Sequence, residues 1–262
     1  MSVNSHLEKI ANGAVLRDIE KQSIQRSIET LRARLNLYFP NELETHLTFG
    51  SYTRGTILPR KYDMRSDIDY MVVFNDKEYK PQTYLNRLKR FVEFYYQRSE
   101  ITQSHPTIML NLNHIRFELV PAVNSLFYGY QIPSPSNQLE SWISTTPNDF
   151  NKKLTEKNTN NFSLIKPLIR VMKYWNAKNS YVFPSYDLEQ NIVNMSFYSC
   201  YSLRDYVYSA IDQLYISYLM PQWKIDAVGR LKKIKNLTQQ YENDAMPLTA
   251  EVEIRKVIPN LE

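Results

Sequence analysis

The spacing of hydrophobic residues changes near residue 150, and this change limits the folds open to the 262-residue chain. Before that point, short runs rich in β-branched and aromatic residues alternate with amphipathic stretches. After it, hydrophobic residues recur at helical spacing almost throughout. We therefore expect an α+β fold, with a mixed sheet flanked by helices over residues 1–150 and a helical domain over residues 151–262.

The same patterns predict where the individual elements lie. Isoleucines and leucines at three- and four-residue spacing predict one long helix over residues 14–38, which Pro40 ends. Asn113 and His114 form a short polar link that suits a hairpin between two strands. We expect strands over 46–49, 68–74, 107–112 and 115–123, helices over 81–98, 186–199, 201–218 and 222–242, and loops at 131–136 and 145–148.

Composition excludes several classes of protein. The chain contains no G-x-G-x-x-G or G-x-x-x-x-G-K loop, which argues against a dinucleotide-binding or P-loop site. Cys200 is the one cysteine, so no internal disulfide and no cysteine-based zinc cluster can form. We find no apolar leader segment and no run of about eighteen apolar residues, so we expect a cytoplasmic protein without a membrane span. The net charge of +5 favours anionic ligands such as nucleotides or nucleic acid.

Two acidic residues open the strand expected over 68–74. Asp67 and Asp69 are two positions apart, so a strand directs both side chains to one face while Ile68 turns to the core. Carboxylates that face one way repel each other unless a cation lies between them, and Mg²⁺ takes oxygen ligands of this kind. An exposed strand end without a metal gives the same pattern, so other residues must decide between the two.

Four further residues point toward a phosphate or metal site. Gly50 and Ser51 end an expected strand, where a glycine lets the backbone approach a triphosphate and a serine offers a hydroxyl and an N–H. Arg54 is either a charge partner nearby or a side chain that points to solvent. Glu118 interrupts an apolar strand. It is either a third metal-binding carboxylate that takes a proton from an attacking hydroxyl, or a residue paired with Arg116 or exposed on the sheet.

The order and spacing of these residues resemble the polymerase-β superfamily of nucleotidyltransferases. The segments 50–56, 67–69 and 118–122 look like the branch that contains 2′-5′-oligoadenylate synthetases, cyclic GMP-AMP synthase and the bacterial CD-NTases. Residues 169–176 (IRVMKYWN) and 184–189 (PSYDLE) resemble the lysine-tryptophan helix and the S-Y-x-L-E helix start of that branch. The resemblance implies a nucleotidyltransferase core followed by a helical domain, with the active site in the cleft between them.

This resemblance also implies roles for individual residues. Asp67, Asp69 and Glu118 would be the catalytic carboxylates and would bind two Mg²⁺ ions, with Mn²⁺ as an alternative metal. The family usually has Asp where this chain has Glu118, so metal preference or rate can differ in this protein.

Residues implied in nucleotide binding come from both halves of the chain, and they are Gly50, Ser51, Arg54, Lys173, Ser185 and Tyr186. Gly50 and Ser51 would hold the β- and γ-phosphates. From the sequence alone, Lys173 equally fits a lysine whose stem lies over the core, and Ser185 a helix N-cap. Tyr186 equally fits a packed ring.

Three functions remain open from the sequence. The resemblance favours an enzyme that joins NTPs into a cyclic or linear oligonucleotide second messenger with release of pyrophosphate, in bacterial anti-phage (CBASS) signalling. An activating ligand or partner protein would then be needed. The second function is a nucleotidyltransferase that acts on RNA or tRNA ends or on a protein acceptor, and the third is an inactive nucleotide-binding module. Residues 229–236 fit the solvated face of an amphipathic helix better than a nucleic-acid patch, and nucleic-acid binding is left open.

Overall fold

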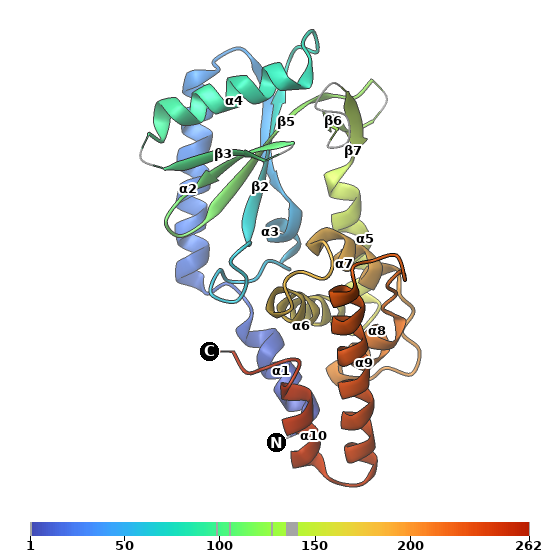
Figure 1. Ribbon diagram of the computed structural model, residues 1–262. Helices are drawn as coiled ribbons and strands as arrows, with labels where there is room; N and C mark the ends of the chain where they lie inside the picture. Colours follow the sequence, from blue (N-terminus) through green and yellow to red (C-terminus); the bar gives the residue numbers. More distant parts are fainter. Residues whose placement is uncertain (1, 98, 105, 127, 135–140, 262) are drawn as a thin grey trace. The chain divides into compact units, whose positions relative to one another are not determined.

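The computed structural model describes residues 2–97, 99–104, 106–126, 128–134 and 141–261 (Figure 1). Contacts between residues divide the chain into two compact units. A sheet unit contains residues 16–60 and 65–152, and a helical unit contains residues 1–15, 61–64 and 153–262.

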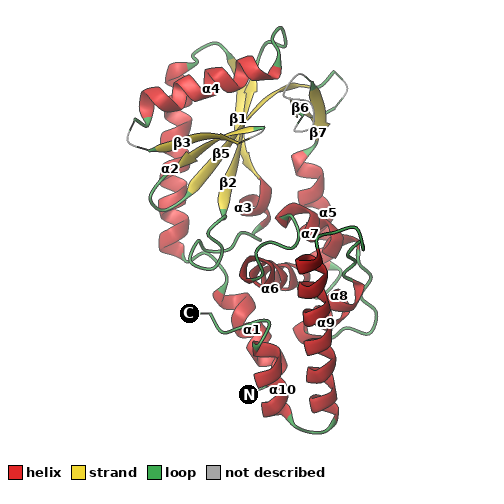
Figure 2. Ribbon diagram, viewed as in Figure 1, coloured by secondary structure: helices red, strands yellow, loops and turns green. Residues whose placement is uncertain are grey.

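In the described residues, the sheet unit has seven strands, with helices beside them (Figure 2). The strands are β1 (Leu43–Phe49), β2 (Asp67–Phe74), β3 (Glu100–Ser104), β4 (Thr107–Asn111), β5 (Arg116–Asn124), β6 (Tyr130–Pro133) and β7 (Trp142–Thr145). The helices are α2 (Asp18–Tyr38), α3 (Gly50–Arg54) and α4 (Pro81–Tyr95), and α5 (Pro147–Thr159) begins in this unit. The strand order is β1-β2-β5-β4-β3, while β6 pairs with β5 and β7. The sheet is mixed, because β2 and β5 are parallel whereas β1 is antiparallel to β2 and β4 to β5.

Alternation along β2 explains how the two faces of the sheet differ. Even-numbered residues from Ile68 to Phe74 join one large hydrophobic core with side chains of α2 and α4, the helices that cover this face (Figure 2). Met71 and Val73 turn to the opposite face, where they pack with Ala122 in a smaller cluster. Because the side-chain period of a strand is two, the acidic positions at the start of β2 lie on the side of Met71, away from α2 and α4.

The helical unit contains α1 (Val3–Gly13), α6 (Ile165–Lys178), α7 (Ser185–Asn194), α8 (Leu203–Gln213), α9 (Gln222–Asn243) and α10 (Pro247–Arg255). Helix α1 packs against α6, α8 and α10, although it lies far from them in sequence. Hydrogen bonds help to hold it there, among them one from Arg204 N to Asn4 Oδ1 at 3.0 Å. His6 Nε2 donates to the carbonyl oxygen of Ile258 at 2.8 Å, and Arg170 Nε donates to that of Ala11 at 2.9 Å.

A short segment, residues 61–64, also belongs to the helical unit. The Tyr181 hydroxyl donates to Asp63 Oδ1 at 2.6 Å, and Asp63 is buried. The ring of Tyr62 meets that of Tyr174 edge-on, with 6.0 Å between centroids. The loop that leads into β2 is therefore fastened to α6 and to the turn that follows it.

The predicted α+β fold, a mixed sheet flanked by helices and then a helical region, is confirmed. Strands β1, β2, β4 and β5 lie within a few residues of their predicted positions, and β4 and β5 form the predicted hairpin. The predicted break at 145–148 separates β7 from α5. The contact division places residues 1–15 and 61–64 with the C-terminal helices, whereas a division at residue 150 would place both with the sheet.

Several elements differ from the prediction. The helix predicted from residue 14 begins at Asp18, and a separate helix α1 precedes it, started by a capping box between Ser2 and Ser5. Strand β6 lies where a loop was predicted over 131–136, although residues 135 and 136 fall outside the described residues. Strands β3, β6 and β7 have four or five residues each, too few for a clear period, so the sequence did not reveal them. Helix α8 ends at Gln213, well before residue 218, and α10 was not predicted.

Candidate active site

The register of β2 and β5 brings the predicted carboxylates together. The strands run parallel, and Asp69 lies opposite Glu118 while Asp67 lies opposite Arg116. Phe117 and Leu119 belong to the core under α2 and α4, so Glu118 between them points to the other face, as Asp67 and Asp69 do. Two neighbouring strands therefore carry three carboxylates on one face of the sheet.

The charges of this cluster are strongly coupled. Burial and, next, the negative charge of Asp67 raise the pKa of Glu118 to about 7, and a hydrogen bond with Asp67 acts in the same direction. The guanidinium of Arg116 opposes this shift. It lies 3.2 Å from Asp67, measured from Nη2 to Oδ2, and donates to the carbonyl oxygen of Arg65 at 2.7 Å. Arg116 therefore forms its salt bridge with Asp67. The alternative that it pairs with Glu118 is wrong.

A divalent cation fits this donor set chemically. The three side chains offer hard carboxylate oxygens, which Mg²⁺ and Mn²⁺ prefer. The raised pKa of Glu118 indicates that negative charge is concentrated here, which a bound cation would relieve. In the part of the chain that the structure describes, no group of three His, Cys, Asp or Glu side chains is arranged to hold a metal ion.

At Gly50, the main chain that follows β1 comes close to this cluster. It follows β1, whose last residue, Phe49, pairs with Asp69. Gly50 has φ +73°, and a Cβ placed on it would lie 1.7 Å from Asp69 Oδ2. Any side chain here would force the Asp69 carboxylate to move, and the positive φ would strain it as well, so the position favours glycine. Ser51 follows in the first turn of α3, half-buried, with its carbonyl oxygen accepting from Thr56 and Ile57.

Arg54 lies at the end of α3 and is 6% exposed, so the solvent-exposed alternative for this residue is wrong. Its guanidinium carbon lies 5.1 Å from the ring centroid of Phe150, in a cation–π contact. This contact joins α3 to the start of α5 within the sheet unit.

The other three predicted nucleotide-binding residues lie in the helical unit. Lys173 of α6 is 5% exposed, and its Nζ lies 3.1 Å from Oε1 of Glu189 in α7, which is 1% exposed. Ser185 is the first residue of α7, but Pro184 is the N-cap, so the N-cap alternative for Ser185 is wrong. Tyr186 is 47% exposed and accepts a hydrogen bond from Gln190 Nε2 at 2.9 Å, so the packed-ring alternative does not describe it.

Two residues of these clusters were not predicted as partners. The sequence suggested Arg116 only as a partner of Glu118, and its pairing with Asp67 depends on a strand register that no local pattern reveals. The partner of Lys173, Glu189, is the last residue of the PSYDLE segment. Its position one helical turn after Ser185 was the sequence feature that could have indicated it.

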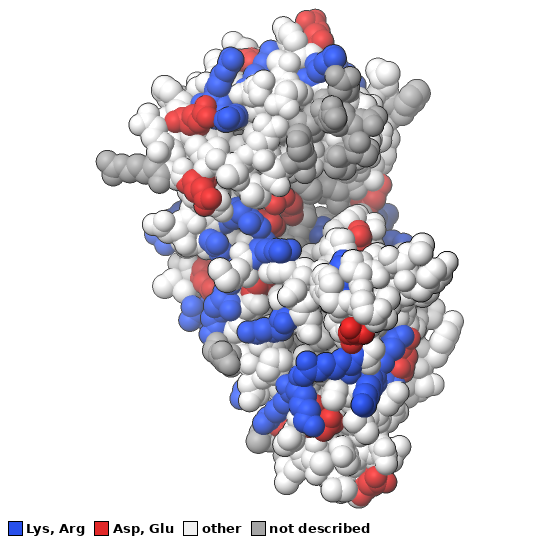
Figure 3. Space-filling view, viewed as in Figure 1, with Lys and Arg blue, Asp and Glu red and all other residues white. Residues whose placement is uncertain are grey.

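The basic stretch 229–236 lies within α9. Leu231 and Ile234 are buried, while Arg230 and Lys233 are exposed, so the stretch is the solvated face of an amphipathic helix (Figure 3). Lys235 is buried and pairs with Asp212 at 2.7 Å. The local structure agrees with the solvated-face interpretation.

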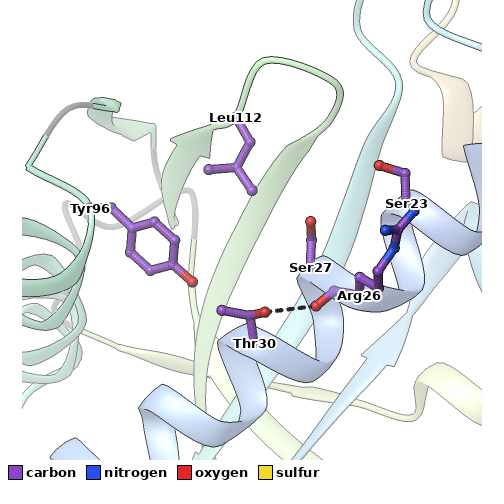
Figure 4. A pocket seen from close by; sticks show the side chains of 6 residues that line it. All are labelled: Ser23, Arg26, Ser27, Thr30, Tyr96 and Leu112. Atoms are coloured by element: carbon purple, nitrogen blue, oxygen red, sulfur yellow. Dashed lines mark hydrogen bonds between the residues drawn. The ribbon is translucent and has the colours of Figure 1, made fainter.

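A hollow of about 270 Å³ lies beside α2 in the sheet unit (Figure 4). Its lining residues are Ser23, Arg26, Ser27, Thr30, Tyr96 and Leu112. Because α2 covers the sheet face opposite the three carboxylates, this hollow is separate from them.

In the described part of the chain, none of the helices combines the length and the apolar character that crossing a membrane requires.

The fold of this chain is also found in solved structures of other proteins. It is similar to the di-nucleotide cyclase of Vibrio cholerae, solved in complex with GTP and 5MTHFGLU2, with a TM-score of 0.76 and 11% sequence identity. That match covers 99% of this chain and 97% of the other. The family model of the Second Messenger Oligonucleotide or Dinucleotide Synthetase domain (SMODS) matches residues 1–158. The chain belongs to this family, which confirms the resemblance stated from the sequence.

Two curated relatives agree with the family. A cyclic AMP-AMP-AMP synthase of an Acinetobacter species is 26% identical over 135 residues, which are 50% of this chain. A probable cyclic nucleotide synthase of Bacillus cereus is 29% identical over 241 residues, which are 73% of this chain. The matched regions span 38% of the Acinetobacter protein and 70% of the Bacillus protein.

Proposed function

We propose that the protein is a metal-dependent nucleotidyltransferase that joins NTPs into a cyclic or linear oligonucleotide with release of pyrophosphate. The observation that carries this proposal is the group of three carboxylates on one face of β2 and β5, with the Gly50 main chain against one of them. Membership of the SMODS family supports it, as do the names of the two curated relatives.

In this proposal, Asp67, Asp69 and Glu118 hold two Mg²⁺ ions, for which Mn²⁺ can substitute. Bound there, the metal neutralises triphosphate charge and lowers the pKa of an acceptor hydroxyl. Glu118 accepts the proton of the attacking hydroxyl in this proposal, since a carboxylate within reach of that hydroxyl can act as a general base.

The nucleotide is held, in the same proposal, by the turn at Gly50 and Ser51. This turn presents main-chain and hydroxyl groups beside Asp69, where a triphosphate needs donors. Arg54, stacked on Phe150, adds positive charge next to α3. From the helical unit, Lys173, Ser185 and Tyr186 contribute a cation, a hydroxyl at a helix start and a ring, as the family resemblance implies.

The product would serve as a second messenger, in bacterial anti-phage signalling in the cytoplasm. An activating ligand or a partner protein would control when it is made. Support for this biological setting comes from the family, whose description names second messenger synthesis.

The test is incubation of the purified protein with all four labelled NTPs and Mg²⁺ or Mn²⁺, followed by phosphatase treatment and mass spectrometry. We expect a phosphatase-resistant oligonucleotide and pyrophosphate. Asp67→Ala with Asp69→Ala should abolish both while leaving the protein folded, and Asp226→Ala, at an exposed position of α9, should leave both unchanged.

Full turnover by the Asp67/Asp69 variant would refute the site assignment. Absence of an oligonucleotide product from the unmodified protein, even with RNA or cell extract added, would refute the proposed reaction.

A further inference from the structure

Arg116 holds the start of β2 at two points. One Nη2 group donates to the carbonyl oxygen of Arg65 at 2.7 Å and lies 3.2 Å from Asp67 Oδ2. Arg116 also lies opposite Asp67 in the parallel register of β2 and β5. The side chains of Arg116 and Asp67 are only 18% and 23% exposed, so solvent screens their attraction weakly.

This contact places a fixed positive charge among the three carboxylates. A divalent cation bound by Asp67 would lie within a few ångströms of the guanidinium, where two positive charges repel strongly. Arg116 also orients the Asp67 carboxylate, which would favour metal binding. The repulsion outweighs this orienting effect, because the contact positions a single carboxylate whereas the charge acts on any cation bound at the site.

We propose that Arg116 competes with the divalent cation for Asp67 and thereby sets the Mg²⁺ concentration at which the carboxylate site fills. This inference rests on the proposed metal-binding role of Asp67, Asp69 and Glu118. A site that binds free Mg²⁺ weakly fills when Mg²⁺ arrives together with an NTP, since the triphosphate supplies the missing negative charge. Arg116 therefore makes metal binding depend on the nucleotide.

The test measures Mg²⁺ binding to the full, nucleotide-free chain by calorimetry and by the Mg²⁺-induced shift in melting temperature. Arg116→Gln removes the charge, and we expect it to bind Mg²⁺ at about ten-fold lower concentration than the unmodified protein. Arg116→Met keeps the aliphatic stem and should behave in the same way, so the result does not depend on one variant folding. Arg116→Lys keeps the charge and should stay within about three-fold of the unmodified protein.

Arg60→Gln is the matched control. Arg60 is a half-buried arginine of the same unit that donates to the carbonyl oxygen of Leu112, in the same hairpin that leads into β5. We expect its Mg²⁺ affinity to equal that of the unmodified protein.

Unchanged or weaker Mg²⁺ binding in the two neutral variants would overturn the inference, as would equal affinities of the Lys and Gln variants. The experiment separates this failure from that of the proposed function. If the Mg²⁺ response disappears in the Asp67/Asp69 variant but is the same in all Arg116 variants, the metal site stands and only the inference about Arg116 is refuted. Absence of any Mg²⁺ response in the unmodified protein removes both the metal site and the competition.

Discussion

Gly50→Ala tests the candidate site most directly, because Gly50 and Gly55, at the two ends of α3, both have a positive φ but differ in surroundings. Gly50 has φ +73° and Gly55 has φ +70°. A Cβ at Gly50 would lie 1.7 Å from Asp69 Oδ2, whereas a Cβ at Gly55 would meet no atom within 4 Å. Both alanine variants therefore carry the cost of a side chain at positive φ, and only one of them disturbs a carboxylate.

The size of each effect follows from this geometry. Alanine at φ near +70° costs about 1–2 kcal/mol, so both variants should lose that much unfolding free energy. Ordinary van der Waals contact begins near 3.4 Å, so the Asp69 oxygen must move by roughly 1.7 Å to accept the new methyl group. A displacement of about 1 Å at a reacting centre can cost about a hundred-fold in rate, so Gly50→Ala should lower turnover at least that much. Gly55→Ala should stay within about two-fold.

The assay pairs pyrophosphate release with urea unfolding of both variants, and the Mg²⁺-induced melting shift gives a readout that needs no turnover. Loss of the Mg²⁺ shift in Gly50→Ala alone would support the placement of Asp69. If Gly50→Ala retains more than half of the activity, or if both variants lose activity equally, the close approach to Asp69 is not what glycine provides at this position.

Two further predictions concern the helical unit. Lys173→Glu leaves two buried carboxylates facing each other and should lower the free energy of unfolding by about 3–5 kcal/mol, measured by urea denaturation. Adding Glu189→Lys restores a pair of opposite charges and should recover much of the lost unfolding free energy. ATP binding should stay weak, because residue 173 no longer carries a positive charge. Recovery of ATP binding would contradict the phosphate-binding role of Lys173. Burial lowers the pKa of His6 below its usual value of 6.5. The unfolded chain therefore binds this proton at a higher pH than the folded chain does, and stability present above about pH 6.5 should be lost as the pH falls through the folded-state pKa. His6→Gln, whose amide can still donate to Ile258, should show a smaller difference in urea midpoint between about pH 7.5 and 5, and an equal difference would contradict the assignment.

The sequence predicted the features that follow from local periodicity, such as which residues share a face of a strand. It predicted few of the contacts between residues that lie far apart in the chain. Asp67 and Asp69 were expected on one face because alternation along a strand is a local property. The position of Glu118 beside Asp69 depends on a parallel register between strands about fifty residues apart, so the residues alone left its role as a third carboxylate as one of several alternatives. The salt bridge of Arg116 to Glu118 was another of these alternatives, and the same register pairs Arg116 with Asp67 instead. The catalytic and binding roles of these residues stay predictions.

Other differences arise where tertiary contacts replace local signals. Helix α1 is short, and its buried residues gain their partners from α6, α8 and α10, so its neighbours in sequence gave no hint of it. Strands β6 and β7 are stabilised by pairing at the edge of the sheet more than by their own composition. The turn before α7 suggested a serine cap, but Pro184 takes that position and Ser185 is the first helical residue.

The packing of α1 against the last helices has a consequence for how the chain folds during synthesis. Leu7 and Ile10 leave the ribosome long before the segment whose Ile258 carbonyl accepts from His6, a partner 252 residues away in sequence. The sheet unit, residues 16–60 and 65–152, can fold before the partners of α1 are synthesised, and until then the apolar side chains of α1 stay exposed. The helical unit can therefore finish folding only after the ribosome has synthesised its last helices.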